Sequence, residues 1–260
     1  MLKGKNAIIT GSTSGIGMGI AYKLAESGCN VLINGFGDAA AIEAELKDIT
    51  AKYGVRDAYS NADMGKPDQI AGMVKQCEDT FGSCDILVNN AGIQFTANVE
   101  DFPQEKWDSI LAINLSSAFH AIKAALPGMK SRGFGRIINI ASAHGLVASK
   151  QKSAYVASKH GIIGLTKVTA LETADFDITA NAICPGWVLT PLVQKQIDDR
   201  ARAQGCDAKK AEAELLGEKQ PKKRFNTPED IGAMAVFLCG PHSAAMTGEV
   251  ISMDGGWTAQ

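Results

Sequence analysis

Short apolar runs rich in β-branched residues alternate along this chain with longer stretches whose apolar positions recur at helical spacing. The short runs predict strands at residues 7–10, 31–34, 57–61, 85–89, 136–141, 178–184 and 250–253. The longer stretches predict helices at residues 16–26, 40–51, 66–81, 107–126, 153–173 and 228–238. Strand and helix therefore follow one another along nearly the whole chain of 260 residues.

This alternation favours an α/β fold, because two successive parallel strands need a crossover long enough to hold a helix. Right-handed crossovers place helices on both faces of an open sheet, and the nearly continuous apolarity of the strands fits burial on both faces. The sequence contains no repeat and no low-complexity linker. We therefore expect a single doubly wound parallel sheet in one domain that spans residues 1–260.

One segment departs from the alternation. After the sixth predicted strand, residues 192–204 and 208–219 show two polar amphipathic patterns before the next core helix. This insertion, about residues 190–222, follows a strand and so lies at the carboxyl edge of the sheet, where ligands of such folds bind. We expect it to form a helical lid over a ligand, and a surface excursion without function is the alternative.

Composition and charge exclude several functional classes. The 26 Lys and Arg against 28 Asp and Glu give a net charge of −2, and the densest basic cluster, residues 219–224, is short, so we expect no nucleic-acid binding. No apolar run reaches the roughly 20 residues of a membrane span, and the first residues lack a signal-peptide core, so we expect a cytoplasmic protein that binds no membrane. The six cysteines show no metal-ligand spacing, which favours buried free thiols and no metal site.

A glycine-rich segment joins the first predicted strand to the first predicted helix. Gly11 can form the tight turn, Gly15 lets the backbone approach a pyrophosphate, and Gly17 lets the helix pack close to the strand. The free N–H groups of a helix N-terminus favour an anion at this place. Because of this context we expect a dinucleotide site, and a tight turn without a ligand is the alternative. The segment also contributes Thr13, Ser14 and Ile16.

The residues after the second predicted strand bear on the choice of dinucleotide. An NAD site commonly has an acidic residue about 20 residues beyond the glycines, whereas an NADP site supplies cations for the extra phosphate. Here Phe36 holds that turn, the carboxylate of Asp38 is displaced, and residues 12–21 and 30–41 contain no Lys or Arg. We therefore expect NAD. Asp63, after the third predicted strand, either accepts a hydrogen bond from the adenine or caps a helix.

Two further turns at the ends of predicted strands fit the nicotinamide half of a dinucleotide. Asn90, Ala91 and Gly92 follow the fourth strand and are small enough to leave room for a ribose. The turn after the sixth strand is placed to hold the carboxamide through its backbone and a threonine hydroxyl. Each turn alone also fits an ordinary loop. The residues of the second turn that we expect to bind cofactor are Pro185, Gly186, Val188 and Thr190.

Four polar residues, Asn114, Ser142, Tyr155 and Lys159, form a candidate catalytic set. Tyr155 and Lys159 lie one helical turn apart on one face, although an ordinary surface pair has the same spacing. Hydride can leave an alcohol carbon only if the hydroxyl proton also leaves, and a free tyrosine has a pKa of about 10. A nearby ammonium and an oxidised nicotinamide are expected to lower that pKa, so Tyr155 is the expected general base.

The other three residues of the set have supporting roles in this hypothesis. We expect Ser142 to donate a hydrogen bond to the substrate oxygen as its charge changes. Lys159 is expected also to bind the ribose hydroxyls of the cofactor, and Asn114 to hold a water that relays protons between Lys159 and solvent.

In order and spacing, these motifs resemble the short-chain dehydrogenase/reductase family. The matching motifs are T-G-x-x-x-G-x-G at 10–17, N-N-A-G at 89–92, Asn114, Ser142, Y-x-x-x-K at 155–159 and P-G at 185–186. The resemblance implies a Rossmann-type sheet of seven strands, a catalytic tetrad of Asn114, Ser142, Tyr155 and Lys159, and a homotetramer. Phe36 departs from the family pattern, because NAD-dependent members often have an aspartate there.

Polar residues near the expected tetrad indicate an acidic substrate. A cation, a titratable ring and two amides are suited to holding a carboxylate through charge-assisted hydrogen bonds. An apolar wall beside them would leave space for little more than a methyl group, so that with Ser142 and Tyr155 the site fits a small hydroxy acid. The polar residues are Gln94, His144, Lys152 and Gln196, and the wall is Trp187 and Trp257. Taken singly, each residue also fits a solvated surface or loop position.

Within the family, residues 92–94, 140–149, 184–187 and 254–257 resemble a bacterial branch that oxidises (R)-3-hydroxybutyrate. This resemblance implies reversible oxidation to acetoacetate with NAD, with the four polar residues on the carboxylate of a small 3-hydroxy or 3-oxo acid and the lid closed over it. Two other hypotheses stay open at this point: an NADPH-dependent 3-oxoacyl thioester reductase of the same family, and a dinucleotide sensor without catalytic activity.

Overall fold

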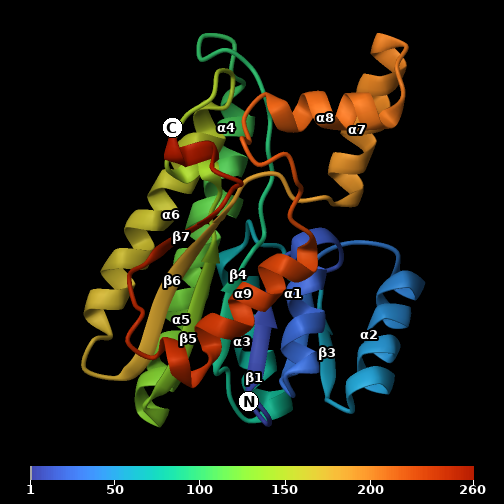
Figure 1. Ribbon diagram of the computed structural model, residues 1–260. Helices are drawn as coiled ribbons and strands as arrows, with labels where there is room; N and C mark the ends of the chain where they lie inside the picture. The colour runs from blue at the N-terminus through green and yellow to red at the C-terminus, as the bar shows by residue number, and fades with distance from the viewer. Residues whose placement is uncertain (1) are drawn as a thin grey trace.

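In the computed structural model, which describes residues 2–260, the chain forms one sheet of seven strands (Figure 1). The strands are β1 (Asn6–Ile9), β2 (Asn30–Asn34), β3 (Asp57–Ser60), β4 (Ile86–Asn89), β5 (Phe134–Ile140), β6 (Asp177–Pro185) and β7 (Val250–Met253). They lie in the order β3-β2-β1-β4-β5-β6-β7, and each neighbouring pair is parallel. The predicted doubly wound parallel sheet is confirmed.

Helices cover both faces of this sheet. They are α1 (Gly15–Glu26), α2 (Ala39–Tyr53), α3 (Pro67–Phe81), α4 (Gln104–Leu111), α5 (Ser117–Arg132), α6 (Ser153–Glu172), α7 (Pro191–Gln204), α8 (Ala208–Gly217) and α9 (Pro228–Cys239). One core cluster joins the sheet to α1, α2 and α9, and a second cluster joins it to α3, α5 and α6 (Figure 1). The molecule therefore has three layers, with the sheet in the middle.

Adjacent residues of one strand supply the two clusters in turn. Ile9 of β1 packs toward α1 and α9, whereas its neighbour Ile8 packs toward α3 and α5, and both are fully buried. Burial of each such side chain stabilises the fold by about 1.5–3 kcal/mol, which explains why these strands are apolar at successive positions.

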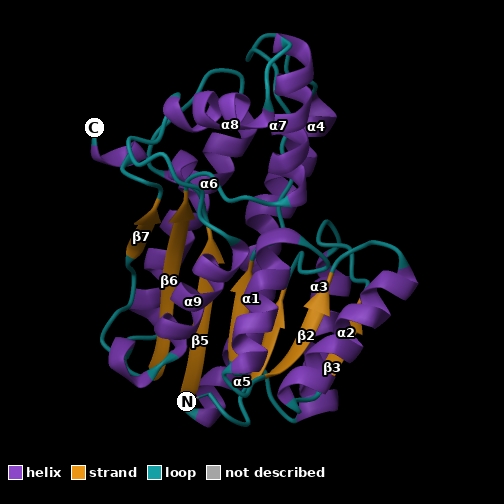
Figure 2. Cartoon of the chain, turned by 45° about the vertical axis from the view of Figure 1, so that its right-hand side comes forward, coloured by secondary structure: helices purple, strands orange, loops and turns teal. Residues whose placement is uncertain are grey.

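The strand order reverses between β1 and β4, which lie side by side in the middle of the sheet. In doubly wound sheets the crevice at such a reversal, outside the carboxyl ends of the strands, is the usual ligand site. Figure 2 shows the strand arrows pointing toward the edge beyond which α7 and α8 lie, and the C-terminus ends at that edge too. The loops after β1, β4, β5 and β6 all start there.

The helix predicted at residues 107–126 is longer than expected and is interrupted. It runs as α4, passes through a π-helical turn over Ala112–Ser116, and continues as α5 to Arg132. Pro127 lies inside α5, where burial of Ala125 and Met129 against the sheet offsets the backbone hydrogen bond that proline removes. By length and composition the run Gln104–Arg132 could cross a membrane, but it packs on the sheet and on α3 as a core helix.

The insertion near residues 190–222 contains α7 and α8, close to the two helices predicted there. Their contact forms a separate apolar cluster around Ile197, Leu216 and Phe225, apart from the two clusters of the sheet. Cys206, between the two helices, is half-buried, whereas the other five cysteines are buried as expected. The insertion therefore has a small apolar core of its own beyond the carboxyl edge of the sheet.

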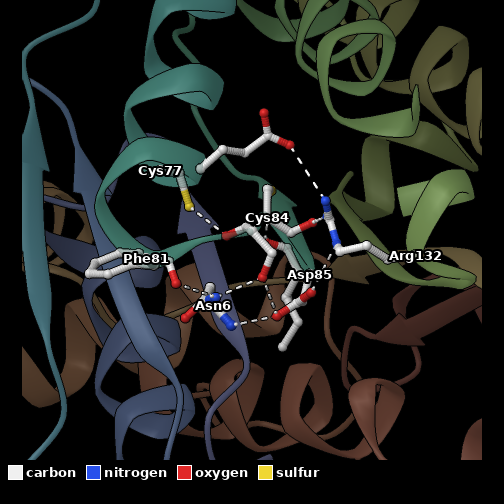
Figure 3. Close-up of polar contacts among 9 residues, drawn as sticks. Asn6, Cys77, Phe81, Cys84, Asp85 and Arg132 are labelled. Carbon is white, nitrogen blue, oxygen red and sulfur yellow. Dashed lines mark hydrogen bonds and ion pairs between the residues drawn. The ribbon is translucent and has the colours of Figure 1, made fainter. Parts of the chain in front are cut away.

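A polar cluster closes the opposite, amino edge of the sheet (Figure 3). The buried carboxylate of Asp85 accepts hydrogen bonds of 3.0 Å from the backbone N–H of Asn6 and from the Ser83 hydroxyl. The guanidinium of Arg132 lies 3.7 Å from the same carboxylate and donates to the carbonyl of Cys84 at 2.7 Å. These contacts join β1, β4 and the end of α5.

We predict that Asp85→Ala destabilises the protein by about 3 kcal/mol, because it leaves the buried N–H of Asn6 without its acceptor and the partly exposed Arg132 without its nearby carboxylate. Denaturant unfolding measures this change. The matched control is Asp79→Ala, which removes an exposed carboxylate paired with Lys75 on one helix and should cost less than about 1 kcal/mol. Equal effects of the two substitutions would show that the Asp85 cluster does not stabilise the sheet edge.

Candidate active site

The glycine loop, residues 10–17, lies in the crevice between β1 and β4. Gly11 and Gly15 have positive φ angles of +60° and +57°, a conformation that favours glycine. A Cβ on Gly11 would lie 2.8 Å from the Cα of Ala91, and one on Gly17 would lie 2.5 Å from the carbonyl of Gly11. This geometry agrees with the predicted tight turn and close helix packing, while the contact of Gly15 with a pyrophosphate stays a prediction.

The N-terminus of α1 opens toward the same crevice. Ser14 holds the cap position, but its side chain does not accept from the helix, so the first N–H groups have no side-chain acceptor. A Cβ built on Gly15 would lie 3.5 Å from the methyl group of Thr190. Thr190 begins α7, because its hydroxyl oxygen accepts from the backbone N–H of Val193 at 3.4 Å. The first turn of the insertion thus lies against the glycine loop.

Buried polar side chains hold the glycine loop in place. Ser12 donates to the carbonyl of Ile9 at 2.6 Å and accepts from the backbone N–H of Asn34 at 3.0 Å. The Asn34 amide oxygen accepts from the backbone N–H of Gly11 at 3.2 Å. The sequence analysis did not identify Ser12 and Asn34. The available signal was a polar residue at the end of apolar strand β2 together with a serine just after β1.

Asn90 also supports this loop. Its amide nitrogen donates to the carbonyls of Thr10 at 2.9 Å and Gly11 at 2.8 Å. The prediction used Asn90 as a small residue that leaves room for a ribose. In the structure its side chain instead braces the glycine loop, while Gly92 lies close enough to Asn114 that an added Cβ would be 3.5 Å from the Asn114 amide oxygen.

The loop after β2 carries no cation. The ring of Phe36 is 66% exposed, and its carbonyl accepts from the Thr13 hydroxyl at 2.9 Å. Asp38 caps α2, accepting from the backbone N–H of Ala41 at 2.9 Å. A 2′-phosphate at this loop would therefore meet an aromatic ring and a carboxylate.

Asp63 does not cap a helix. The cap position of α3 belongs to Lys66, and the Asp63 carboxylate accepts from the backbone N–H of Gly65 at 2.8 Å within its own turn. The helix-cap alternative was therefore wrong, because the turn ends and α3 begins later than that alternative required. The adenine contact of Asp63 stays a prediction.

The π-helical turn places Asn114. Its side chain is 1% exposed, and its amide oxygen accepts from the backbone N–H of Ile93 at 2.8 Å. The amide nitrogen donates to the Ile93 carbonyl at 2.9 Å and to the Ser158 hydroxyl at 3.3 Å. Because a π-helical turn shifts the helical register locally, it directs this polar side chain toward the loop after β4 and toward α6.

Tyr155 and Lys159 lie on the first turns of α6, beside the end of β5. The Lys159 ammonium donates to the carbonyl of Ile140, the last residue of β5, at 2.7 Å and lies 5.6 Å from the centre of the Tyr155 ring. Burial lowers the pKa of Lys159 from 10.5 to about 8. The predicted proximity of the two side chains is confirmed.

The pKa of Tyr155 differs from expectation. Burial raises this pKa above its ordinary value, and a hydrogen bond with the Ser142 side chain only partly opposes the rise. The expected lowering by Lys159 is not seen in the protein by itself, where removal of the phenolate from water is the largest influence on this pKa. Ser142 follows β5, and its hydroxyl oxygen accepts from the backbone N–H of His144 at 3.1 Å, which leaves its proton available to donate.

His144 packs between two aromatic rings of the site. Its ring meets Tyr155 edge-on with centroids 5.9 Å apart and Trp257 edge-on at 4.9 Å. Its Nε2 lies 2.9 Å from the Ser149 hydroxyl and shares a hydrogen bond with it. Burial, with smaller contributions from Lys152 and Lys219, lowers the pKa of His144 from 6.5 to about 4, so the ring is neutral at neutral pH.

Lys152 stands at the start of α6, and burial followed by the charge of Lys219 lowers its pKa. His144, Lys152 and Trp257 are thus brought together as predicted. Gln94 and Gln196 are exposed, and within residues 2–260 neither side chain forms a hydrogen bond. Their convergence on the same carboxylate stays a prediction.

Gln220 is a residue that sequence reasoning missed. It is 1% exposed; its amide oxygen accepts from the backbone N–H of Trp187 at 2.6 Å, and its nitrogen donates to the carbonyl of Arg224 at 3.0 Å. A Cβ on Gly186 would lie 2.4 Å from the Gln220 amide oxygen. Gln220 therefore joins the turn after β6 to the return of the insertion. Its place in a polar run hid this role.

The indole of Trp187 packs on the α7–α8 cluster, and its buried Nε1 has no hydrogen-bond partner among the described residues. Val188 is buried and bridges to Asn226, while Pro185 ends β6. The turn after β6 thus carries the insertion at the mouth of the crevice.

Comparisons with known proteins agree with this geometry. A family model described as enoyl-(acyl carrier protein) reductase matches residues 11–258. The chain is 59% identical to the D-beta-hydroxybutyrate dehydrogenase of Cupriavidus necator over 100% of both chains, and 54% identical to that of Rhizobium meliloti over 98% of this chain and 99% of the relative.

Among solved structures, L-sorbose reductase from Gluconobacter frateurii, in complex with NADPH and L-sorbose, superposes with a TM-score of 0.95. It is 30% identical, and the match covers 100% of this chain and 98% of the other. A seven-stranded parallel sheet, the glycine loop in its crevice and the adjacent Tyr155 and Lys159 thus occur in a chain that matches dehydrogenases and reductases along its full length. The protein belongs to the short-chain dehydrogenase/reductase family.

Proposed function

We propose that this protein catalyses the reversible, NAD-dependent oxidation of (R)-3-hydroxybutyrate to acetoacetate, with Tyr155 as the general base. The observation that carries the proposal is the position of half-buried Tyr155 and buried Lys159 beside His144 and Lys152, which would join a proton-transfer site to a carboxylate site. The full-length identity with two D-beta-hydroxybutyrate dehydrogenases supports the same reaction.

In this mechanism Tyr155 takes the hydroxyl proton of the substrate and returns it in the reverse direction. Because burial raises the pKa of Tyr155, its phenolate needs nearby positive charge. A bound oxidised nicotinamide supplies that charge together with an acceptor for the hydride of the carbinol carbon. The Lys159 ammonium, fixed by the Ile140 carbonyl, adds a second positive charge close to the phenol.

Ser142 and Asn114 support this proton transfer. The Ser142 hydroxyl, whose one proton serves Tyr155 in the protein alone, would donate instead to the substrate oxygen, which gains negative charge when the proton leaves. One lone pair of the Asn114 amide oxygen is used by Ile93, and the second can hold a water that links Lys159 to solvent. Lys159 would also donate to the ribose hydroxyls, since an ammonium has three protons and one serves Ile140.

The residues of the crevice fit a nicotinamide dinucleotide. The pyrophosphate would lie over the glycine loop and the N-terminus of α1, the adenine near Asp63, and the nicotinamide between Gly92 and the turn that carries Val188 and Thr190. The loop after β2 favours NAD over NADP, because it offers an aromatic ring and no cation to a 2′-phosphate. The Gluconobacter frateurii reductase was solved with NADPH, but it is only 30% identical to this chain.

The acid end of the substrate would lie between Lys152 and His144. Lys152 offers a cation, and His144, neutral near pH 7, can still donate one hydrogen bond without adding charge. Trp257 meets His144 edge-on and, with Trp187, would limit the space beside the reacting carbon to about a methyl group. The side chains of Gln94 and Gln196 are exposed and unoccupied by other hydrogen bonds within the described residues. Both would reach the carboxylate when the insertion, which carries Gln196, closes over the site.

Two rival functions are weaker on these observations. A 3-oxoacyl thioester reductase would need an open groove for a carrier arm and a cation for NADPH, whereas Trp187 with the insertion narrows the groove and the loop after β2 lacks the cation. A dinucleotide sensor would not require Asn114, Ser142, Tyr155 and Lys159 to meet in one buried site.

We also propose a cytoplasmic homotetramer. Exposed apolar side chains lie on α5 and α6, which cover the same face of the sheet: Phe119, Val168 and Leu171 are 46%, 52% and 79% exposed. Association of copies through this face would bury them. The six free thiols agree with a reducing compartment.

We predict that the protein reduces NAD with (R)-3-hydroxybutyrate and that Tyr155→Phe lowers kcat by about a thousandfold or more while NAD still binds, because the variant lacks the proton acceptor. The measurements are nicotinamide absorbance for turnover and calorimetry for binding. Activity with the (S) isomer alone, or with NADPH and acyl thioesters alone, would refute the substrate assignment. Nearly normal turnover of the variant would refute Tyr155 as the base.

We predict that His144 makes folding stability depend on acid pH. Its pKa is about 4 in the folded protein against 6.5 ordinarily, so below about pH 6.5 the unfolded state binds the extra proton and stability falls as pH drops toward 4. His144→Gln should flatten the plot of unfolding free energy against pH in that window. Exposed His242→Gln is the control of the same type outside the site. An equal slope in the protein and in His144→Gln would contradict the neutral buried ring.

A further inference from the structure

Lys219 lies on the segment that returns from α8 to the sheet. Its own backbone N–H donates to the carbonyl of Leu216 at 3.2 Å, and the next residue is the buried Gln220. Gln220 fixes this segment to the turn of Trp187, whereas the side chain of Lys219 is exposed. The position of Lys219 is thus tied to the insertion while its ammonium can reach outward.

The ammonium of Lys219 lies near the proposed carboxylate site, since its charge acts on both His144 and Lys152. It lies 5.9 Å from the centre of the Trp257 ring, and Trp257 in turn meets His144 edge-on at 4.9 Å. His144 meets Tyr155 at 5.9 Å. A continuous set of contacts therefore runs from the return segment of the insertion to the proposed base.

Lys219 and Lys152 are two cations near one place without an acidic partner. Within residues 2–260 neither ammonium takes part in an ion pair. The acids beside them are engaged elsewhere: Glu218 pairs with Arg200, and Asp254 accepts from Thr258. The repulsion between the two lysines contributes to the lowered pKa of Lys152. An anion bound between two such cations would offset the repulsion between them.

We propose that Lys219 is a second substrate-binding cation, carried by the insertion, which holds the carboxylate from the side opposite to α6 and couples substrate charge to closure of the insertion. This inference rests on the proposed function. Without an anion, repulsion from Lys152 opposes approach of the return segment; a carboxylate between the two ammonium groups replaces that repulsion by two attractions. The site would thereby favour an acid over a neutral molecule of the same shape.

The test compares acetoacetate with acetoacetamide, which has nearly the same shape and no charge. Lys219→Gln should raise KM for acetoacetate about fivefold or more and leave KM for acetoacetamide within about twofold, because one partly exposed charge pair is lost. Lys219→Arg keeps the positive charge and should therefore have a KM for acetoacetate close to that of the unchanged protein. The matched control is Lys223→Gln, an exposed lysine of the same segment, which should leave both KM values unchanged.

Equal effects of Lys219→Gln on the charged and the neutral substrate, or no effect on either, would overturn this inference and leave the proposed function standing. Calorimetric binding of acetoacetate to the protein with oxidised NAD bound measures the same charge contribution without turnover. A protein that neither reduces nor binds acetoacetate would overturn the proposed function, and with it the inference. If the protein binds acetoacetate only when Lys219 is present but does not reduce it with NADH, the proposed function is wrong and the anion site at Lys219 stands.

Discussion

A half-buried phenol, Tyr155, and the buried ammonium of Lys159 lie side by side and set the conditions for the rest of this site. Burial disfavours both charged forms, since it raises the pKa of Tyr155 and lowers that of Lys159 to about 8. In the proposed mechanism a proton therefore moves from the substrate to Tyr155 only when further positive charge stabilises the phenolate. Tyr155 and Lys159 lie at the end of β5, at the same edge of the sheet as the glycine loop, where the proposed cofactor would supply that charge.

The parallel sheet makes this convergence possible. Because all seven strands point the same way, the loops after β1, β4, β5 and β6 emerge at one edge, and side chains far apart in sequence meet there. The polar cluster around Asp85 closes the other edge, so the stabilising contacts and the reactive ones lie at opposite ends of the sheet. The insertion has an apolar cluster of its own, apart from the clusters of the main core.

The sequence was sufficient for the fold and for the proximity of Tyr155 and Lys159, because hydrophobic period and motif spacing are local signals. It was insufficient where tertiary context decides. The π-helical turn that directs Asn114 inward has no period of its own, Asn90 proved to brace the glycine loop, and Gln220 looked like part of a polar surface run. The direction of the Tyr155 pKa depends on burial, which a motif does not report.

The most direct test of this account is the pKa of the Tyr155 phenol, measured from tyrosinate absorbance as the difference between the protein and Tyr155→Phe, with and without oxidised NAD. The account predicts a raised pKa in the protein alone and a fall of about one unit or more when oxidised NAD binds, with a smaller fall for NADH. The same pKa in the free and the NAD-bound protein would contradict the claim that cofactor charge makes this phenol a base.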